Sequence, residues 1–393
     1  MIGEPVSIGI VIAAAALGTW IYLVFGRGGF WRARAWEDDD RSPEPSAWPR
    51  VVAVIPARNE ADMLPDTLAS LLRQDYPGQF RVVLVDDHSE DATADAARAV
   101  AGLSQSKHPL TILAAAALPQ GWTGKLWAVR QGVARACEPP DPADYLLLTD
   151  ADIAYEADAV RRLVAHALAR DLALASLMVE LHCESPAEKA LVPAFVFFFQ
   201  MLYPFAWVSD PRRKTAAAAG GCMLVRRQAL QRAGGIDAIR GALIDDCALA
   251  RAVKPVGPIS LDLTRKVHSR RPYPGLADIR HMVSRSAYDQ LGCSPLLLAG
   301  TVAGMALVYL APPLLALLGG GPARVLGIAA WALMAAAFRP ILRFYRRSPL
   351  WGLALPAIAA TYVAFTLDSA YQHVRGRGGL WKGRVQAGVS RVR

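Results

Sequence analysis

The uneven distribution of hydrophobic residues limits the folds open to this chain more than any other feature. Residues 6–25 form a run without a charged side chain. The run reaches the length of about 20 residues that a helix needs to cross hydrocarbon. Three further apolar runs lie at residues 294–318, 325–338 and 350–371, and the long middle of the chain has an ordinary globular composition. We therefore predict a globular domain held by membrane segments on both sides.

The residues around the first apolar run favour a retained anchor over a cleaved signal peptide. A signal peptide has a basic leader, whereas the leader here contains Glu4 and no Lys or Arg. Arg27, Arg32 and Arg34 follow the run instead. Because basic residues tend to stay on the cytoplasmic side, residues 1–26 are predicted to anchor a cytoplasmic domain to the bacterial inner membrane.

The formal net charge of +9 raises the question of a nucleic-acid partner. Between Arg339 and Arg393 there are ten Lys and Arg and one acidic residue, Asp368, so the excess lies beside the late apolar runs. Basic residues are commonly found beside membrane segments, because they tend to stay on the cytoplasmic side and are attracted to anionic lipids. A nucleic-acid module needs basic residues on a folded face with aromatic side chains that stack on bases, and the sequence contains no such module. We predict a membrane partner and no nucleic acid.

The cysteines favour a reducing compartment. There are five, Cys137, Cys183, Cys222, Cys247 and Cys293, and they are widely spaced. No pair has the spacing of zinc ligands, and nothing indicates a disulfide framework. A reducing cytosol fits this pattern.

From residue 50 onward, strand-like runs alternate with helical patterns. The strand-like runs are VVAVIP (51–56), FRVVLVDD (80–87), LTILAAA (110–116), YLLLTDAD (145–152) and LALASLMVEL (172–181). Such alternation predicts an α/β fold with a mostly parallel, Rossmann-like sheet and helices on both faces. We place this domain at residues 50–290.

Two segments beside or within this domain have their own character. Residues 27–49 are acidic and rich in proline, and they are predicted to form a linker. Residues 190–208 are uncharged and long enough to span a bilayer, but a single crossing there would separate Asp150 from Asp246. We predict an interfacial segment that lies in the headgroup layer, with a buried core element as the alternative.

The sequence leaves the number of membrane crossings open. Residues 291–371 form the predicted C-terminal membrane region, and residues 372–393 form a basic tail. If all three late runs cross, this tail ends outside, against the charge rule. The run at 325–338 is short for a span, and Pro312-Pro313 interrupts the run before it. A re-entrant segment is the alternative that keeps the tail inside.

Polar clusters follow three of the predicted strands. They lie at residues 58–60, 86–88 and 150–152. In open α/β sheets, ligands bind beyond the carboxyl ends of the strands. We therefore expect the three clusters to form one site.

Asp150-x-Asp152 is the sharpest of these clusters. Two carboxylates at such a turn can bind Mg²⁺ or Mn²⁺ together with a diphosphate, because such cations take a few carboxylates plus phosphate oxygens. The cation then neutralises charge as a nucleotide diphosphate leaves. The alternative is an acidic turn, since Asp commonly ends strands by bonding to nearby backbone.

Two other strand-end or helix-start residues have a similar double interpretation. Asp87 can accept a hydrogen bond from a nucleotide base, or it can belong to a turn. Lys125 lies after a glycine at an expected helix start, where a lysine and the helix N-terminus can hold phosphate together. Its alternative is a solvated surface lysine.

A second acidic pair, Asp245-Asp246, begins a helical stretch. One of the two can be the general base for an acceptor hydroxyl, because its acidic neighbour helps to raise its pKa. Carboxylates also favour a helix N-terminus, so helix capping is the alternative. Gly220-Gly221 can let the backbone approach a substrate on the acceptor side, or it can form a plain turn.

The order of six motifs resembles family 2 glycosyltransferases with the GT-A fold. The motifs are VVAVIPARNE, LVDDHSED, GWTGKLWA, LLLTDADI, GGCMLVRRQALQRAGGI and IDDCALARAV. The resemblance covers roughly residues 50–255. It implies donor-binding residues, metal ligands with Asp152 as the direct one, and a base, Asp246, with Asp245 in place of the family's Glu. The implied donor-binding residues are Pro56, Ala57, Glu60 and Asp87 at the nucleoside, with Lys125 and Asp150 near the phosphates.

One motif departs from the family's processive polysaccharide synthases. Those enzymes have Gln-x-x-Arg-Trp before their later membrane segments, whereas residues 282–286 here are Met-Val-Ser-Arg-Ser. Arg285 can still offset diphosphate charge, but the tryptophan that supports a polymer is absent. The difference favours single transfer.

The layout of the whole chain is similar to the hopene-associated subfamily, with SRSAYDQLGCSPLLLAG and LDSAYQHVRGRGGLWKGR after the domain. This resemblance implies an inverting enzyme that moves a sugar from a nucleotide-diphosphate sugar to a lipid, here a hopanoid. The alternatives are a polysaccharide synthase, a polyprenyl-phosphate or carotenoid glycosyltransferase, and an inactive membrane scaffold that retains the fold.

Overall fold

The computed structural model describes residues 8–40, 42–103, 108–376, 380–381 and 384–385. The chain forms two compact units. The apolar-helix unit comprises residues 1–34, 183–206 and 273–379, and the sheet unit comprises residues 35–182, 207–272 and 380–393. Residues 183–206 and 273–290, which we expected in the globular domain, thus group with the apolar helices.

The sheet unit is built on a mixed sheet with mostly parallel pairing. Its strands are β1 (Val51–Ala57), β2 (Phe80–Asp86), β3 (Leu110–Ala114), β4 (Tyr145–Leu148), β5 (Ile153–Tyr155), β6 (Leu174–Glu180), β7 (Met223–Arg226) and β8 (Ile259–Ser269). Their order is β3-β2-β1-β4-β7-β6-β8-β5. The pairs β1–β2, β2–β3, β1–β4 and β6–β8 are parallel, whereas β7 runs antiparallel to β4 and β6, and β5 to β8. The predicted α/β class is confirmed.

The sequence of β1 explains its central position. All seven of its residues are buried, as expected for a continuous apolar run with helices on both faces of the sheet. Val51 pairs with Phe80 of β2 on one side and with Tyr145 of β4 on the other. This register aligns the carboxyl ends of β1, β2 and β4 at one edge, where the polar clusters follow.

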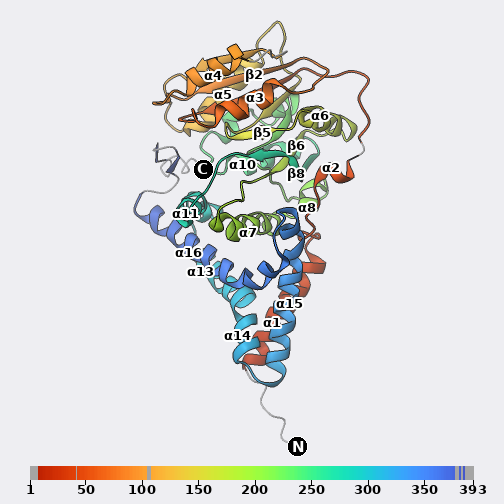
Figure 1. Ribbon diagram of the computed structural model, residues 1–393, viewed down its shortest axis with the longest axis vertical. Coiled ribbons are helices and arrows are strands. Elements are labelled where there is room, and N and C mark those ends of the chain that lie inside the picture. The colour runs from red at the N-terminus through yellow and green to blue at the C-terminus, as the bar shows by residue number, and fades with distance from the viewer. Residues whose placement is uncertain (1–7, 41, 104–107, 377–379, 382–383, 386–393) are drawn as a thin grey trace, which may run out of the picture. The chain divides into compact units, whose positions relative to one another are not determined.

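Helices and short turns surround this sheet, and Figure 1 shows α3 and α5 beside β2. They are α2 (Trp36–Asp39), α3 (Leu64–Leu72), α4 (Thr93–Leu103), α5 (Gly124–Ala136), α6 (Ala159–Ala169), α8 (Phe205–Ser209), α9 (Arg227–Arg232), η2 (Ile236–Ile239), α10 (Asp245–Val253) and η3 (Lys254–Val256), with a small ribbon of β9 (Leu380–Trp381) and β10 (Arg384–Val385). Helices α4, α5 and α6 alternate with the strands, as the sequence pattern predicted.

Part of the predicted linker is docked on the sheet unit. Trp36 is buried, and its ring nitrogen contacts His166 Nδ1 at 3.1 Å. The carboxylate of Glu37 accepts hydrogen bonds from Thr264 Oγ1 at 2.9 Å and from the backbone N–H of Arg265 at 2.7 Å. One acidic residue of this segment, Glu37, therefore makes a specific contact with β8, and the buried Trp36 beside it anchors the segment.

The apolar-helix unit contains α1 (Ile8–Ile21), η1 (Tyr22–Gly26), α7 (Pro186–Leu202), α11 (Leu276–Ser284), α12 (Ala287–Gln290), α13 (Pro295–Met305), η4 (Ala306–Leu310), α14 (Ala311–Leu318), α15 (Gly321–Phe344), η5 (Pro349–Ala354) and α16 (Leu355–Val374). Helices α1, α14 and α15 lie side by side (Figure 1). Within the described residues, four helical stretches are long and apolar enough to cross a membrane: Ile8–Gly26, Pro295–Leu318, Gly321–Phe344 and Pro349–Val374.

Two sequence features spoke against three late membrane spans, and the fold accounts for both. The run at 325–338, expected to be short, belongs to a helix of 24 residues. Pro312-Pro313 does not end the preceding helical stretch, because the two prolines stand at the first turn of α14, directly after the π-helical turn η4. Proline is tolerated there, since the first-turn amides have no partner within the helix.

Helix α7 covers most of the predicted interfacial segment and packs inside the apolar-helix unit. The ring of Phe197 lies 5.1 Å from that of Phe338, and the hydroxyl of Tyr362 donates to the carbonyl of Leu191 at 2.9 Å. The carbonyl of Met201 accepts a hydrogen bond from Arg27 at 2.7 Å. These contacts make α7 part of the unit's core, and its location at a membrane surface stays a prediction.

The two late motifs of the subfamily resemblance contact each other in this unit. Ser284 Oγ donates to Asp368 at 2.9 Å, and the backbone N–H of Tyr288 donates to Ser369 Oγ at 3.0 Å. Arg285 lies between them, directly after α11. Its predicted role at the donor diphosphate stays a prediction, and most of the predicted basic tail lies outside the described residues.

Packing of α5 on β1 gives a test of this arrangement. A Cβ added at Gly132 would lie 2.4 Å from Val54 Cγ1, so Gly132→Ala forces the helix away from the sheet. We expect it to lower the free energy of unfolding by about 1–3 kcal/mol, the usual cost of overpacking. Denaturant titration of the detergent-purified protein, followed by tryptophan fluorescence, measures the change.

Gly102→Ala is the matched control, because Gly102 is also helical and a Cβ there would meet nothing within 4 Å. Alanine is the better helix former, so this variant should gain about 0.5 kcal/mol. Equal effects of the two substitutions would contradict the packing of α5 on β1.

Candidate active site

A pocket in the sheet unit gathers residues from the ends of the central strands. Its lining residues come from β1, α5, β4, the turn before β7, η2 and α10. They are Pro56, Lys125, Leu126, Val129, Leu148, Thr149, Asp150, Gly220, Met223, Ile236, Ile239, Asp245 and Leu249. Pro56, Lys125, Asp150, Gly220 and Asp245 are among the residues that we predicted for the site, so the structure brings these five together.

Lys125 connects two carboxylates at this pocket. Its Nζ lies 2.8 Å from Asp150 Oδ1 and 2.9 Å from Asp245 Oδ2. The lysine is placed by the start of α5, where the side chain of Thr123 caps the helix by accepting from the N–H of Leu126. Burial disfavours the charged amine, but the charges of Asp150 and Asp245 outweigh it and raise the pKa of Lys125. The alternative of a solvated surface lysine is thereby excluded.

Asp246 has both of its carboxylate oxygens occupied by backbone donors. Oδ2 accepts from the N–H of Gly220 at 3.0 Å, and Oδ1 accepts from the N–H of Cys247 at 2.6 Å. Burial, followed by the neighbouring charge of Asp245, raises the pKa of Asp246 to about 6. A carboxylate with such a pKa is suited to accept a proton near neutral pH.

The capping alternative for the acidic pair is met only in part. Both carboxylates stand in the first turn of α10, where negative charge is favourable, but Asp246 accepts from the adjacent N–H of Cys247, which is not a capping contact. Asp245 pairs instead with Lys125, and the residue before the helix, Ile244, has no side chain that can cap. Asp245 therefore lines the pocket, and neither carboxylate makes a capping hydrogen bond at the start of α10.

The two glycines of Gly220-Gly221 serve different purposes. A Cβ on Gly220 would lie 3.5 Å from Asp246 Oδ2, 3.7 Å from Lys125 Nζ and 3.8 Å from Asp150 Oδ2. A Cβ on Gly221 would lie 3.1 Å from Val179, inside the core. A Cβ on Gly220 would thus reach ordinary contact with three charged groups, whereas one on Gly221 would crowd apolar side chains of the core.

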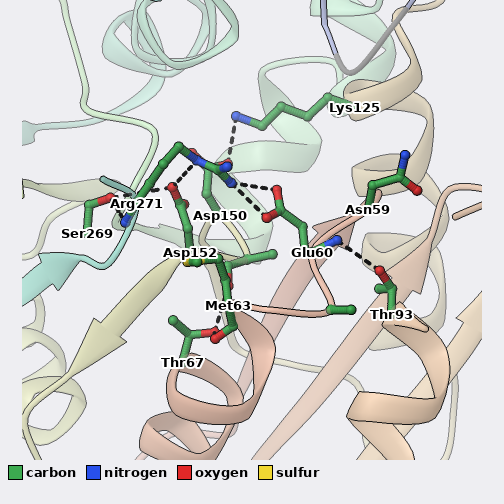
Figure 2. A network of polar contacts seen from close by, with 12 residues as sticks. Asn59, Glu60, Met63, Thr67, Thr93, Lys125, Asp150, Asp152, Ser269 and Arg271 are labelled. Atoms are coloured by element: carbon green, nitrogen blue, oxygen red, sulfur yellow. Dashed lines mark hydrogen bonds and ion pairs between the residues drawn. The ribbon is translucent and has the colours of Figure 1, made fainter. Parts of the chain in front are cut away.

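Arg271 joins the first strand-end cluster to the Asp-x-Asp motif. Figure 2 shows its guanidinium between Glu60 and Asp152, while Lys125 points to Asp150. Nη2 donates to both oxygens of Glu60 at 2.7 and 2.8 Å, and Nε donates to Asp152 Oδ2 at 2.7 Å. The amide of Glu60 is itself held by Thr93 Oγ1 at 2.8 Å.

Arg271 is not among the site residues predicted from the sequence. The available signal was the basic pair Arg270-Arg271 directly after β8. Strand β8 pairs with β5, and the backbone N–H of Arg270 donates to the carbonyl of Asp152 at 2.8 Å. The omission followed from the missing prediction of β8, because only that strand brings the pair to the Asp-x-Asp turn.

The remaining predicted donor residues lie at the ends of β1 and β2. Asp87 is buried, and its N–H donates to the carbonyl of Ala57 at 2.8 Å. Arg58 ties the two strand ends by donating to the carbonyl of Asp87 at 2.6 Å. Asp86 is bound by the hydroxyl of Ser89, so the turn interpretation holds for Asp86.

Comparisons with known proteins agree with this geometry. Residues 52–234 match the family described as "Glycosyl transferase family 2". The chain contains a family 2 glycosyltransferase domain. An N-acetylglucosaminyltransferase of Mesorhizobium japonicum is 31% identical over 201 residues, which are 49% of this chain and 42% of the relative. One of Rhizobium leguminosarum bv. viciae is 29% identical over 203 residues, with the same shares. The chain thus spans less than half the length of these relatives.

A solved structure shares its fold with most of this chain. Mannosyltransferase PcManGT from Pyrobaculum calidifontis, in complex with GDP-Man and Mn²⁺, is 20% identical with a TM-score of 0.55. The alignment covers 93% of this chain and 98% of that chain. At this identity the likeness concerns the fold, and it confirms the predicted GT-A class.

The residues present fit a divalent cation that is shared with a substrate. Within the described ranges, no group of three or more His, Cys, Asp and Glu side chains gathers to hold a metal. Asp150 and Asp152 each have one oxygen bound to a cationic side chain, Lys125 or Arg271. Desolvation raises the pKa of Asp150, against the charge of Lys125 and with support from Asp152 and Asp245. Such a pair suits a cation that takes its other ligands from phosphate and water.

The bridge made by Lys125 gives a test of the site's electrostatics. Lys125→Gln leaves Asp150, Asp245 and Asp246 without their shared cation. The pair is partly exposed, so we expect a loss of about 1–3 kcal/mol in the free energy of unfolding, below the cost for a fully buried pair. Denaturant titration at pH 7.5 measures it.

The double variant Lys125→Gln/Asp245→Asn is the control for this test. It removes one of the repelling carboxylates and should recover at least half of the loss. A double variant that is less stable than Lys125→Gln would contradict the bridge as the source of the effect.

Proposed function

We propose that this chain is a membrane-bound, inverting glycosyltransferase that moves a sugar from a nucleotide-diphosphate sugar to a lipid acceptor. The observation that supports this most is the bridge from Asp150 through Lys125 to Asp245, with Asp246 beside it. In this bridge a lysine joins the first Asp of the Asp-x-Asp motif to Asp245 at the pocket, and Asp246, a carboxylate of raised pKa, lies on the other side of Gly220.

The proposed donor site lies between the end of β1 and the start of α5. Pro56, Ala57, Glu60 and Asp87 are the proposed nucleoside side, and Lys125 with Asp150 is the phosphate side. The similar proteins are named for N-acetylglucosamine transfer, and PcManGT was solved with GDP-Man. Both names support a nucleotide-sugar donor, and we take N-acetylglucosamine and mannose as the first sugars to test.

The proposed reaction is a single in-line displacement at the anomeric carbon. Asp246 takes the proton of the acceptor hydroxyl as its oxygen forms the new glycosidic bond, and the bond to the diphosphate breaks with inversion. The amides of Gly220 and Cys247 fix the orientation of the Asp246 carboxylate. Lys125 offsets the charge of the leaving diphosphate, so positioning and charge stabilisation supply most of the rate.

A divalent cation, Mg²⁺ or Mn²⁺, is part of this proposal. Asp152 and Asp150 would hold it, and when bound it neutralises negative charge on the leaving nucleotide diphosphate. Arg285, at the end of α11, is a further proposed contact for that charge. The Mn²⁺ in the complex of PcManGT supports the metal.

The apolar helices support a membrane location and a lipid acceptor. Leu296 and Leu318, at the two ends of one candidate span, are 85% and 80% exposed, as side chains in contact with lipid tails would be. We propose an inner-membrane protein with its glycosyltransferase domain in the cytoplasm. A hopanoid acceptor rests on the subfamily resemblance, and the absence of the processive motif favours transfer of one sugar.

Two alternatives give different products. A polysaccharide synthase makes a polymer that gel analysis detects, and a polyprenyl-phosphate or carotenoid enzyme labels a different lipid. An inactive scaffold binds no nucleotide diphosphate. The raised pKa of Asp246 and its open neighbour Gly220 favour an enzyme over a scaffold, because a scaffold has no need of a desolvated carboxylate.

The first test uses the purified full chain with Mn²⁺, labelled UDP-GlcNAc or GDP-Man, and a bacterial lipid extract that contains hopanoids. We expect one labelled lipid, identified by mass spectrometry. Asp246→Asn should lower the rate at least about 100-fold, the contribution of a general base. Donor affinity, measured by calorimetry, should change little. A near wild-type rate for Asp246→Asn would overturn the base assignment.

The pKa of Asp246 sets the expected pH dependence. Because the base must be ionised, kcat/KM should fall as pH drops through about 6. Asp245→Asn removes a neighbouring negative charge, which lowers the pKa of Asp246 and moves this acid limb to lower pH. Initial rates between pH 4.5 and 8 measure both profiles. A limb that stays in place or moves to higher pH in Asp245→Asn would contradict the coupling.

A further inference from the structure

Arg271 binds Asp152, one of the two carboxylates proposed to hold the metal, and it also binds Glu60. Its Nε binds Asp152 Oδ2 at 2.7 Å, and its Nη2 binds both oxygens of Glu60. The side chains of Asp152 and Glu60 are only 13% and 9% exposed. Two carboxylates at this depth repel each other, and the guanidinium between them offsets this repulsion.

The two contacts of Arg271 use different nitrogen atoms. The bond to Asp152 comes from Nε, whereas both bonds to Glu60 come from Nη2. Arg271 can therefore release Asp152 and still stay bound to Glu60. Only the contact with Asp152 is then lost, and the charge of Glu60 stays paired with the guanidinium.

We propose that Arg271 is a placeholder cation that competes with the divalent metal for Asp152. In the donor-free protein it holds Asp152 in position and disfavours binding of a metal alone. When the metal arrives together with a nucleotide diphosphate, the added phosphate ligands outweigh the lost contact, and Arg271 yields Asp152. Arg271 is thus a positioning residue that links metal binding to donor binding. The inference rests on the proposed function, because it assumes a metal at Asp152.

The test measures Mn²⁺ binding to the detergent-purified full chain without nucleotide, by the electron paramagnetic resonance signal of free Mn²⁺. Arg271→Gln removes the competing charge and exposes the two carboxylates to the metal. We expect the affinity for Mn²⁺ alone to rise roughly tenfold or more, as for removal of a like charge in close contact. Arg271→Lys keeps a charge without the planar fork and should give an intermediate affinity.

Arg270→Gln is the matched control. Arg270 is the exposed neighbour, and its contact with Asp152 comes from the backbone, so the variant loses the same formal charge without opening the carboxylates. Its affinity for Mn²⁺ should stay within about twofold of wild type. If Arg271→Gln fails to fold, Arg271→Lys against Arg270→Gln gives the same comparison.

A second titration with UDP or GDP present separates this inference from the proposed function. We expect wild type to bind Mn²⁺ far more tightly with the nucleotide, and Arg271→Gln to lose most of that difference. Suppose that wild type binds Mn²⁺ in the presence of nucleotide, but that Arg271→Gln and Arg270→Gln have equal affinities for Mn²⁺ in its absence. The placeholder role is then wrong, and the proposed metal stands. If no variant binds Mn²⁺ under either condition, the metal and the placeholder role are both overturned.

Discussion

The mutual repulsion of carboxylates is the constraint on which the rest of the site depends. Asp150, Asp245 and Asp246 come from two separate segments, the turn after β4 and the start of α10, and they meet around Lys125 and Gly220. Without a cation they would repel each other and lose the solvation of water. Lys125 compensates them from a third segment, the first turn of α5. The placement of α5 on β1, with Gly132 against Val54, is therefore also a condition for the chemistry.

The same constraint is solved twice at neighbouring positions. Lys125 holds Asp150 with Asp245, and Arg271 holds Asp152 with Glu60, so each carboxylate of the Asp-x-Asp motif has its own cation from elsewhere in the chain. The two cations differ in chemistry. A lysine is a point charge that suits phosphate, whereas an arginine fork binds two acceptors with fixed geometry. This difference favours Lys125 as a diphosphate contact and Arg271 as an organiser of the carboxylates.

The apolar-helix unit is packed in a different way, with few charged contacts among its described residues and large apolar side chains left exposed. Inside it, aromatic side chains such as Phe197 and Phe338 and buried polar pairs such as Ser284 with Asp368 define which helices contact which. Outside, large leucines remain exposed along the candidate spans. The combination agrees with helices that pack by shape and hydrogen bonds while their outer faces meet hydrocarbon. It supports the proposal that the glycosyltransferase domain works on an acceptor that resides in the bilayer.

The sequence by itself determined the α/β class, the five strands from 51 to 181, the candidate spans and the polar residues at the strand ends. These features are local, since periodicity and strand-end chemistry involve residues near one another in the chain. Only the tertiary structure decided which carboxylate pairs with which cation. Arg271 meets Glu60 across 211 residues, and the contact requires β8 to join β5 and β6 in the sheet. No local pattern encodes that order, because it follows from the packing of the whole sheet. The anchoring of residues 27–49 by Trp36 could not be predicted for the same reason, because its partner His166 lies on α6, far away in the sequence.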